Sequence, residues 1–230
     1  MKTNKKKKSI VLLSAGLDST VNLAIALEKT NVVLALTFNY GQRAVQKEIS
    51  SARKICKHYQ IPHQVIDLQW LKNLGDSSLT DRSIKIPTGN SIAIDDIKTS
   101  EKTAQSVWIP NRNGLFLNTA AAFAESYQAE FIIPGFNAEE AKTFPDNSLA
   151  FLKKTNGALA YSTQTKVKAH CYTINLVKPQ IVKMGLKYKA PFHLMWPCYL
   201  SSKKWCGECE SCQRARRAFA VNGLTLETFA

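Results

Sequence analysis

Acidic residues and long apolar runs are both scarce in this sequence of 230 residues. Only 17 Asp and Glu face 31 Lys and Arg, which gives a formal charge of +14 at pH 7. The longest apolar runs are too short to cross a bilayer. The basic run 5–8 is not followed by the apolar segment of a signal peptide. The sequence therefore predicts a cytoplasmic protein without a membrane segment.

The positive charge is concentrated in the second part of the chain. From residue 151 onward there are 13 Lys and Arg but 3 Asp and Glu. Such a surface attracts anions, which include nucleic acids and small ligands such as ATP. Aromatic residues do not alternate with the basic ones as they do on a base-stacking surface. Small anionic ligands are therefore favoured, and RNA binding stays open as an alternative.

The chain also lacks a Lys in its most informative loop. The apolar run 10–13 predicts a buried strand, the small-residue loop 14–19 follows it, and a helical pattern begins at Ser19. Backbone N–H groups and the positive end of the helix dipole converge at such a junction and favour a phosphate. Without a Lys after the loop, this is not the loop of the common nucleoside triphosphatases. An ordinary strand-to-helix turn is the alternative.

Strand and helix patterns alternate along the rest of the chain. Further strands are expected at 32–38, 63–68, 130–133 and near 171–176, and helices at about 19–29, 45–59, 115–128, after Asp146, and at 180–186. This alternation predicts an α/β fold with a doubly wound, mostly parallel sheet, in which ligands bind at the carboxyl ends of the strands. Residues 72–107 show poor periodicity and predict a long loop or a pair of short elements.

Four of the six cysteines lie within fifteen residues near the C-terminus. They are Cys198, Cys206, Cys209 and Cys212. Four closely spaced thiolates suit a closed tetrahedral zinc site that stabilises the C-terminal region. An iron–sulfur cluster is the chemical alternative, although its fourth cysteine normally follows the Cys-x-x-Cys-x-x-Cys run. Cys56, in a predicted helix, and Cys171, in a predicted strand, are expected to be small core residues.

A series of short motifs occurs in a fixed order along nearly the whole chain. They cover residues 14–19, 38–43, 79–81, 109–113, 135–139, 144–146, 196–198, 206–212 and 214–219. The first resembles the pyrophosphate loop, Ser-Gly-Gly-x-Asp-Ser, of the ATP pyrophosphatases. The whole series resembles the 7-cyano-7-deazaguanine synthase family. The order and spacing of so many motifs are more specific than any one of them.

The resemblance implies a Rossmann-like fold of the adenine nucleotide alpha hydrolase type and a ligase that forms carbon–nitrogen bonds. The family uses ammonia and ATP with Mg²⁺ to turn 7-carboxy-7-deazaguanine into a nitrile for queuosine-type bases. It implies a homodimer, one structural zinc ion per chain bound by the cysteine quartet, a catalytic domain at 1–195 and a zinc-binding region at 196–230.

The resemblance also implies roles for individual residues. The expected catalytic residues are Asp18, Ser19, Arg112 and Lys178. The expected ATP-binding residues are Leu12, Leu13, Ser14, Ala15, Gly16, Leu17, Asp18, Ser19, Thr20, Val21 and Arg43. The expected substrate-binding residues are Tyr40, Asn137, Glu139 and Asp146. Arg and Lys suit phosphates and carboxylates, and Asp18 is expected to orient the loop or to help hold Mg²⁺.

Some positions depart from the family pattern. Ala15 stands in place of a Gly, Ala44 in place of a His, and Asn147-Ser148 in place of Cys-Arg. If the φ angle of Ala15 is positive, its Cβ strains the loop by about 1 kcal/mol. These departures leave two alternatives open. One is a paralogue that adenylates another substrate, and the other is a zinc-stapled nucleotide- or RNA-binding protein without turnover.

Overall fold

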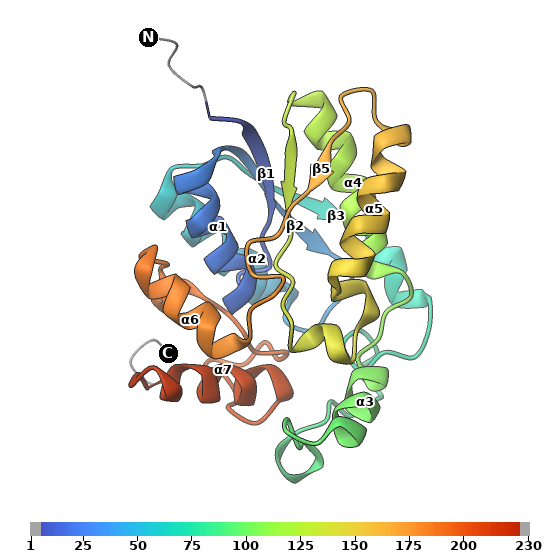
Figure 1. Cartoon of the computed structure of the whole chain (residues 1–230). Coiled ribbons are helices and arrows are strands. Elements are labelled where there is room, and N and C mark those ends of the chain that lie inside the picture. The colour runs from blue at the N-terminus through green and yellow to red at the C-terminus, as the bar shows by residue number, and fades with distance from the viewer. Residues whose placement is uncertain (1–5, 226–230) are drawn as a thin grey trace.

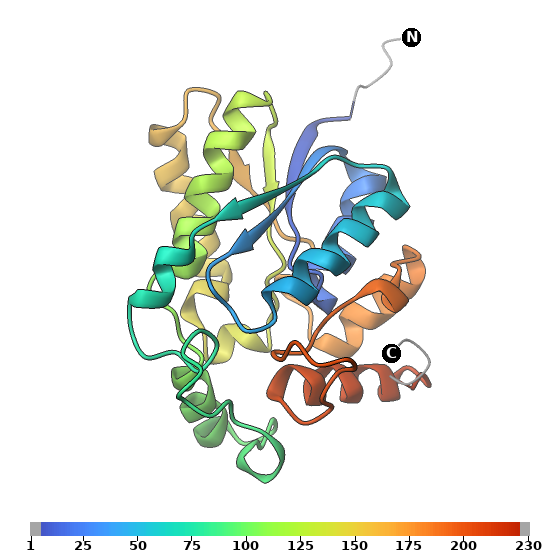
Figure 2. The same cartoon turned by 180° about the vertical axis from the view of Figure 1, so that it is seen from behind.

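Five parallel strands form one sheet in the computed structural model, which describes residues 6–225 (Figures 1 and 2). The strands are β1 (Lys8–Leu12), β2 (Asn31–Asn39), β3 (His63–Asp67), β4 (Phe131–Ile133) and β5 (Lys168–Ala169). Their order, β3-β2-β1-β4-β5, places β1 in the centre, where Val11 pairs with Ala35 on one side and Ile133 on the other. The predicted α/β class with a parallel sheet is confirmed. The loops that follow β1, β2 and β4 therefore meet at one edge.

Helices cover both faces of the sheet. They are α1 (Leu17–Lys29), α2 (Val45–Tyr59), α3 (Ile97–Ser106), α4 (Arg112–Ser126), α5 (Leu149–Ser162), α6 (Lys178–Lys187) and α7 (Glu210–Val221). Alternate residues of β1 serve the two faces: Val11 packs with residues of α1 and α2, whereas Ile10 and Leu12 pack with residues of α4 and α5. Side chains alternate along a strand, so β1 contributes residues to both layers, and the helices on the two sides bury both faces of the sheet.

The last two helices pack against the helix that begins at the Ser14–Ser19 loop. Val21 of α1, Ile181 of α6 and Phe219 of α7 belong to one buried cluster. The C-terminal part of the chain thereby supports α1, and α6 and α7 lie below α1 in Figure 1. None of the described helices is long and apolar enough to span a bilayer.

The strand expected at 171–176 was wrong. The strand β5 ends at Ala169, and the chain turns at once. The hydroxyl of Thr173 donates to the carbonyl oxygen of Phe136 at 2.6 Å, and the thiol of Cys171 donates to the same oxygen at 3.3 Å. Side chains therefore satisfy a carbonyl that a strand would have bonded through its backbone. Cys171 is nevertheless a buried core residue, as expected.

Other boundaries differ by a few residues. The segment 72–107 contains α3 and a single-turn helix at Gly89–Ser91. Helix α4 begins at Arg112, three residues before the expected start, because Asn111 adopts a left-handed conformation (φ 51°) that the sequence pattern does not show. The helix expected after Asp146 is α5, capped by Ser148. The basic run 5–8 lies partly outside the described residues.

Candidate active site

The loop Ser14–Ser19 joins the end of β1 to the first turn of α1, of which Gly16 is the N-cap. The hydroxyl of Ser14 lies 3.1 Å from that of Ser19 and accepts a hydrogen bond from the Gly16 N–H at 3.3 Å. The first N–H groups of a helix have no acceptor within the helix. These groups and the two hydroxyls form a cluster of donors at the positive end of the helix dipole, which suits an anion.

Ala15 is the residue at which this loop turns. Its φ angle is 62°, whereas that of Gly16 is −72°. A left-handed conformation costs a residue with a Cβ about 1–2 kcal/mol. The methyl group of Ala15 is fully buried beside Leu13. The carbonyl oxygen of Ala15 accepts a hydrogen bond from the backbone N–H of Trp196 at 2.8 Å. Packing and this hydrogen bond hold the loop in the strained conformation.

Lys178 forms a buried ion cluster at the same edge of the sheet. Its Nζ lies 2.7 Å from Asp18 Oδ2 and 2.7 Å from Glu140 Oε1, and its side chain is 5% exposed. Burial disfavours the charged amine, but the two carboxylates outweigh this effect and raise the pKa of Lys178. Burial raises the pKa of Asp18 to about 6, against the attraction of Lys178. The other oxygen of Asp18, Oδ1, is buried without a hydrogen-bond partner among residues 6–225.

Arg112 and Tyr40 come together from α4 and the end of β2. Arg112 Nη1 donates to the Tyr40 hydroxyl at 3.4 Å, and its guanidinium lies 5.5 Å from the centre of the Tyr40 ring. Burial raises the pKa of Tyr40 to about 12, so the phenol stays neutral. Nearby, the side-chain amide of Gln42 donates to Glu48 Oε2 at 2.8 Å. Burial raises the pKa of this Glu48 carboxyl to about 7.

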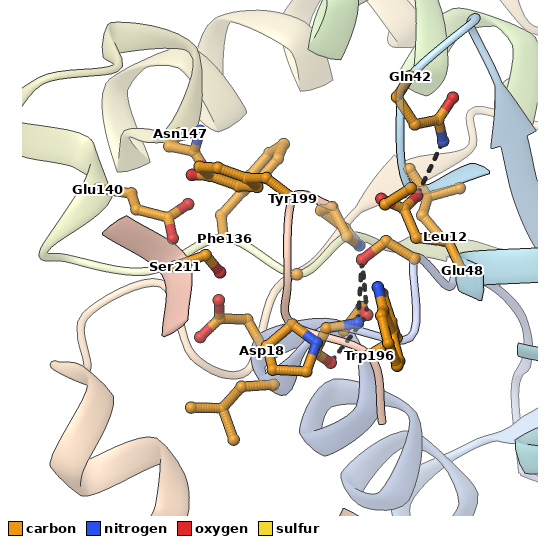
Figure 3. A pocket seen from close by; sticks show the side chains of 18 of the residues that line it. Leu12, Asp18, Gln42, Glu48, Phe136, Glu140, Asn147, Trp196, Tyr199 and Ser211 are labelled. Carbon is orange, nitrogen blue, oxygen red and sulfur yellow. Dashed lines mark hydrogen bonds between the residues drawn. The ribbon is translucent and has the colours of Figure 1, made fainter. Parts of the chain in front are cut away.

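These groups line one cavity of about 240 Å³. In Figure 3, Gln42 and Glu48 lie on one side of the cavity and Glu140 and Asn147 on the opposite side. Its floor comes from the Ser14–Ser19 loop, and aromatic side chains from several elements form much of the wall. These aromatic residues are Phe38, Tyr40, Phe116, Phe136, Phe144, Trp196 and Tyr199. The cavity lies at the carboxyl ends of β1, β2 and β4, where open parallel sheets bind ligands.

The cysteine quartet lies beside the cavity. The sulfur atoms of Cys198, Cys206, Cys209 and Cys212 all lie within 4.8 Å of one another. The sulfurs of Cys206 and Cys212 are 4.0 Å apart. Four thiolates at about 2.3 Å from a tetrahedral zinc ion lie about this far apart, so the donor set fits Zn²⁺. Cys198 also lines the cavity, which places the cluster beside the site.

Glu139 connects α7, which carries the last of these cysteines, to Lys178. Its Oε2 accepts hydrogen bonds from Arg214 at 3.2 Å and Arg217 at 2.6 Å, both on α7. Its Oε1 accepts the backbone N–H of Lys178 at 2.8 Å. Arg214 is also paired with Glu210 at 2.7 Å. A network of ion pairs and hydrogen bonds therefore runs from α7 through Glu139 to the backbone of Lys178.

The structure brings most of the expected site residues together. Those that line the cavity are Leu12, Leu13, Ser14, Gly16, Leu17, Asp18, Ser19, Tyr40, Arg112 and Lys178. Seven expected residues do not line it: Ala15, Thr20, Val21, Arg43, Asn137, Glu139 and Asp146. Val21 packs in the core below the loop, and the hydroxyl of Thr20 and one oxygen of Asp146 are buried without partners among the described residues.

Two of these seven residues hold the backbone of neighbouring loops. Arg43 Nη2 donates to the carbonyl oxygens of Asp81, at 2.6 Å, and Ile84. The side-chain oxygen of Asn137 accepts the backbone N–H of Glu139 at 3.0 Å. In this arrangement Arg43 fixes the segment after residue 79, and Asn137 fixes the turn that positions the ion cluster.

Several cavity-lining residues were not among the predicted ones. They include Gln42, Glu48, Glu140, Trp196, Glu210 and Arg214. For Glu48 the sequence held a usable signal. It lies three residues after Val45 and four before Ala52, on the apolar face of helix α2. A carboxylate on a buried helical face needs a partner or a function.

Comparisons with known proteins agree with this geometry. Residues 8–223 match the family model described as queuosine biosynthesis protein QueC. The chain is 56% identical over 224 residues to a 7-cyano-7-deazaguanine synthase of Bdellovibrio bacteriovorus, with 97% of each protein covered. It is 48% identical over 218 residues to one of Desulforamulus reducens, with 95% of this chain and 96% of that protein covered.

Among solved structures, a 4-thiouridine synthetase in complex with RNA and with bound ATP has a similar fold. The TM-score is 0.51 at 14% identity, and the match covers 94% of this chain and 52% of that one. This likeness concerns the fold alone. The family match and the sequence identities carry the assignment: the chain belongs to the QueC family of queuosine biosynthesis proteins, the family of the 7-cyano-7-deazaguanine synthases.

Proposed function

We propose that the cavity is the active site of an ATP-dependent ligase that makes 7-cyano-7-deazaguanine from 7-carboxy-7-deazaguanine and ammonia. A carboxylate is a poor electrophile, so its oxygen first attacks the α-phosphorus of ATP and releases pyrophosphate. Ammonia displaces AMP and leaves an amide. A second ATP adenylates the amide oxygen, and loss of AMP and of the two remaining N–H protons leaves the nitrile.

The Ser14–Ser19 loop is the proposed pyrophosphate site. Its hydroxyls and the first N–H groups of α1 are donors that are already in place before the ligand binds. The amine of Lys178 lies at the same loop, where it is paired with Asp18 of the first helical turn, and it is a further donor for a phosphate oxygen. Fixed donors of this kind stabilise the negative charge that develops on the leaving pyrophosphate.

Asp18 is the proposed protein ligand of Mg²⁺. One of its oxygens is paired with Lys178, while the other is buried and lacks a hydrogen-bond partner among the residues described. A hard cation bound by one carboxylate and by phosphate oxygens would satisfy this oxygen. When bound, Mg²⁺ supplies charge neutralisation for the triphosphate. Arg112, which lines the cavity above Tyr40, is the proposed contact for a phosphate or carboxylate group.

The cysteine quartet is proposed to hold one structural zinc ion per chain. The four thiolates would fill the tetrahedral coordination of such an ion and would leave no position for substrate or water. The segment 196–230 then acts as a zinc-binding region that closes the site built by residues 1–195. Cysteines stay reduced in the cytoplasm, so four free thiolates are consistent with the proposed cytoplasmic location. The homodimer implied by the family is a further proposal, to be measured by light scattering.

The observation that carries this proposal is the convergence of the Ser14–Ser19 loop, Lys178 and Arg112 on one cavity in a chain of this family. The test uses zinc-loaded protein with ATP, Mg²⁺, ammonium and 7-carboxy-7-deazaguanine. Pyrophosphate, AMP and the nitrile should form together and be lost in Lys178→Met. The variant Glu28→Gln, at an exposed position of α1, is the matched control and should keep full activity.

Two other outcomes would point elsewhere. Pyrophosphate without nitrile would mean that the chain adenylates another substrate. Folded protein that binds ATP but releases no pyrophosphate would refute the proposal and favour a binding role, for which salt-dependent RNA binding is the check.

A further inference from the structure

One carboxylate of the cavity is not used by the phosphate site. Four carboxylates line the cavity: Asp18, Glu48, Glu140 and Glu210. Asp18 and Glu140 are paired with Lys178, and Glu210 is paired with Arg214. Glu48 alone forms no ion pair with any residue of the described range 6–225.

The orientation of Glu48 is fixed by Gln42. The Gln42 amide nitrogen donates to Glu48 Oε2 at 2.8 Å and to the Phe38 carbonyl oxygen at 3.0 Å, while its oxygen accepts the Tyr40 N–H at 3.0 Å. Gln42 is 3% exposed, so its own position is set by the turn after β2. Glu48 Oε1 accepts no hydrogen bond from residues 6–225. Figure 3 shows the Glu48 side chain among those that line the cavity, opposite Glu140.

Part of the lining of this cavity is apolar and aromatic. It includes Leu12, Leu36, Phe38 and Phe116, and the rings of Phe38 and Phe116 are stacked with centroids 4.1 Å apart. Such a surface fits a flat ring. A buried carboxylate without an ion-pair partner is poorly solvated, and burial raises the pKa of Glu48 although the hydrogen bond from Gln42 and the charge of Arg112 lower it. A ligand with N–H donors would replace the hydrogen bonds from water that the carboxylate loses on burial.

We infer that Glu48 is the specificity residue that binds the N–H edge of the deazaguanine ring, accepting hydrogen bonds from the ring N–H and the 2-amino group. This inference rests on the proposed function. The two donors of a 2-amino-4-oxopyrimidine ring lie side by side and point the same way, which matches the two oxygens of a carboxylate. The equivalent edge of adenine offers one donor beside an acceptor, so the ring of ATP fits Glu48 less well.

The test pairs a protein variant with a ligand variant. Binding to zinc-loaded protein is measured by calorimetry for 7-carboxy-7-deazaguanine and for its analogue without the 2-amino group. A bidentate pair of this kind discriminates by about ten- to hundredfold. The wild type should prefer the natural substrate by that factor, and Glu48→Gln should lose most of the preference. The KM for ATP should stay within about twofold, since the adenine is not read by Glu48.

Two further variants keep the inference falsifiable. Glu48→Asp retains the carboxylate and should keep part of the preference, whereas Glu28→Gln, an acid-to-amide change at an exposed position, should keep all of it. If Glu48→Gln folds and still prefers the amino-bearing substrate, the inference is wrong. A rise in the KM for ATP with no change in substrate preference would assign Glu48 to the adenine and also overturn it. Either result leaves nitrile formation by the wild type, and with it the proposed function, untouched.

Discussion

A methyl group added at Gly135 should damage the phosphate site directly. Gly135 follows Pro134 at the end of β4 and lines the cavity. A Cβ at this position would lie 2.7 Å from the backbone nitrogen of Ser19 and 2.8 Å from its Cα, and 3.1 Å from the carbonyl carbon of Asp18. These neighbours are backbone atoms of the first turn of α1, which cannot rotate away as a side chain can.

The cost of Gly135→Ala follows from this overlap. Forcing a methyl group into a packed site costs about 1–3 kcal/mol. For a chain of this size, 1 kcal/mol corresponds to about 2–4 °C, so the melting temperature should fall by about 2–12 °C. The helix terminus must also move away from the position proposed to bind pyrophosphate. Because a misplacement of about 1 Å can cost about a hundredfold in rate, kcat/KM for ATP should fall at least tenfold.

Gly157→Ala is the matched control. Gly157 lies on the exposed side of α5, and a Cβ there meets no atom within 4 Å. Alanine favours a helix over glycine by about 0.5–1 kcal/mol, so this variant should melt slightly higher and keep its activity. The assay is a thermal melt by circular dichroism together with pyrophosphate release. If Gly135→Ala melts and turns over like the wild type, the close approach of β4 to α1 does not constrain the site as argued.

Three other predictions follow from the ion and cysteine clusters. Lys178→Met leaves Asp18 and Glu140 without their cation and should lower the free energy of unfolding, measured by urea titration, by about 3–5 kcal/mol. Adding Glu140→Gln should recover part of that stability but should not restore pyrophosphate release. A stable and active Lys178→Met variant would contradict the role of this amine. Burial holds the pKa of Asp18 at about 6, above the ordinary 3.8, so the wild type loses stability relative to Asp18→Asn as the pH rises through about 6. Paired thermal melts at pH 4.5 and pH 7.5 check this, and a difference that does not change with pH would refute it. Metal analysis should show that Cys209→Ser binds no zinc, and its melting temperature should be lower, because the remaining thiolates no longer hold α7 in place through a shared ion. Cys56→Ala changes a core residue of α2 outside the cysteine cluster, and this variant should still bind zinc.

Local features of the sequence were enough to locate the Ser14–Ser19 loop and the cysteine cluster. The run of apolar residues before Ser14 and the helical spacing after Ser19 encode a strand, a turn and a helix within about twenty residues. The spacing of Cys206, Cys209 and Cys212 likewise brings three thiols together within one turn and the start of a helix. Such features depend on neighbours in the chain, and the sequence shows those neighbours directly.

The strand expected at 171–176 was wrong because its fate depends on distant residues, which local sequence features do not show. The segment after His170 has the composition of a strand, but its hydrogen bonds go from the side chains of Cys171 and Thr173 to Phe136. Whether a segment joins a sheet depends on which backbone groups face it, and Phe136 lies 35 residues before Cys171 in the chain. Periodicity carries no information about that choice.

Residue types and spacing by themselves determined the α/β class, the position of the Ser14–Ser19 loop, the cysteine quartet and the resemblance to a family. The tertiary structure decided what each charged side chain does. It paired Lys178 with two carboxylates, paired Glu139 with two arginines of α7, and left Glu48 without an ion pair among residues 6–225. Distant segments supply these partners. The free energy of a buried charge depends on the atoms that surround it after folding, and the order of residues along the chain does not specify those atoms.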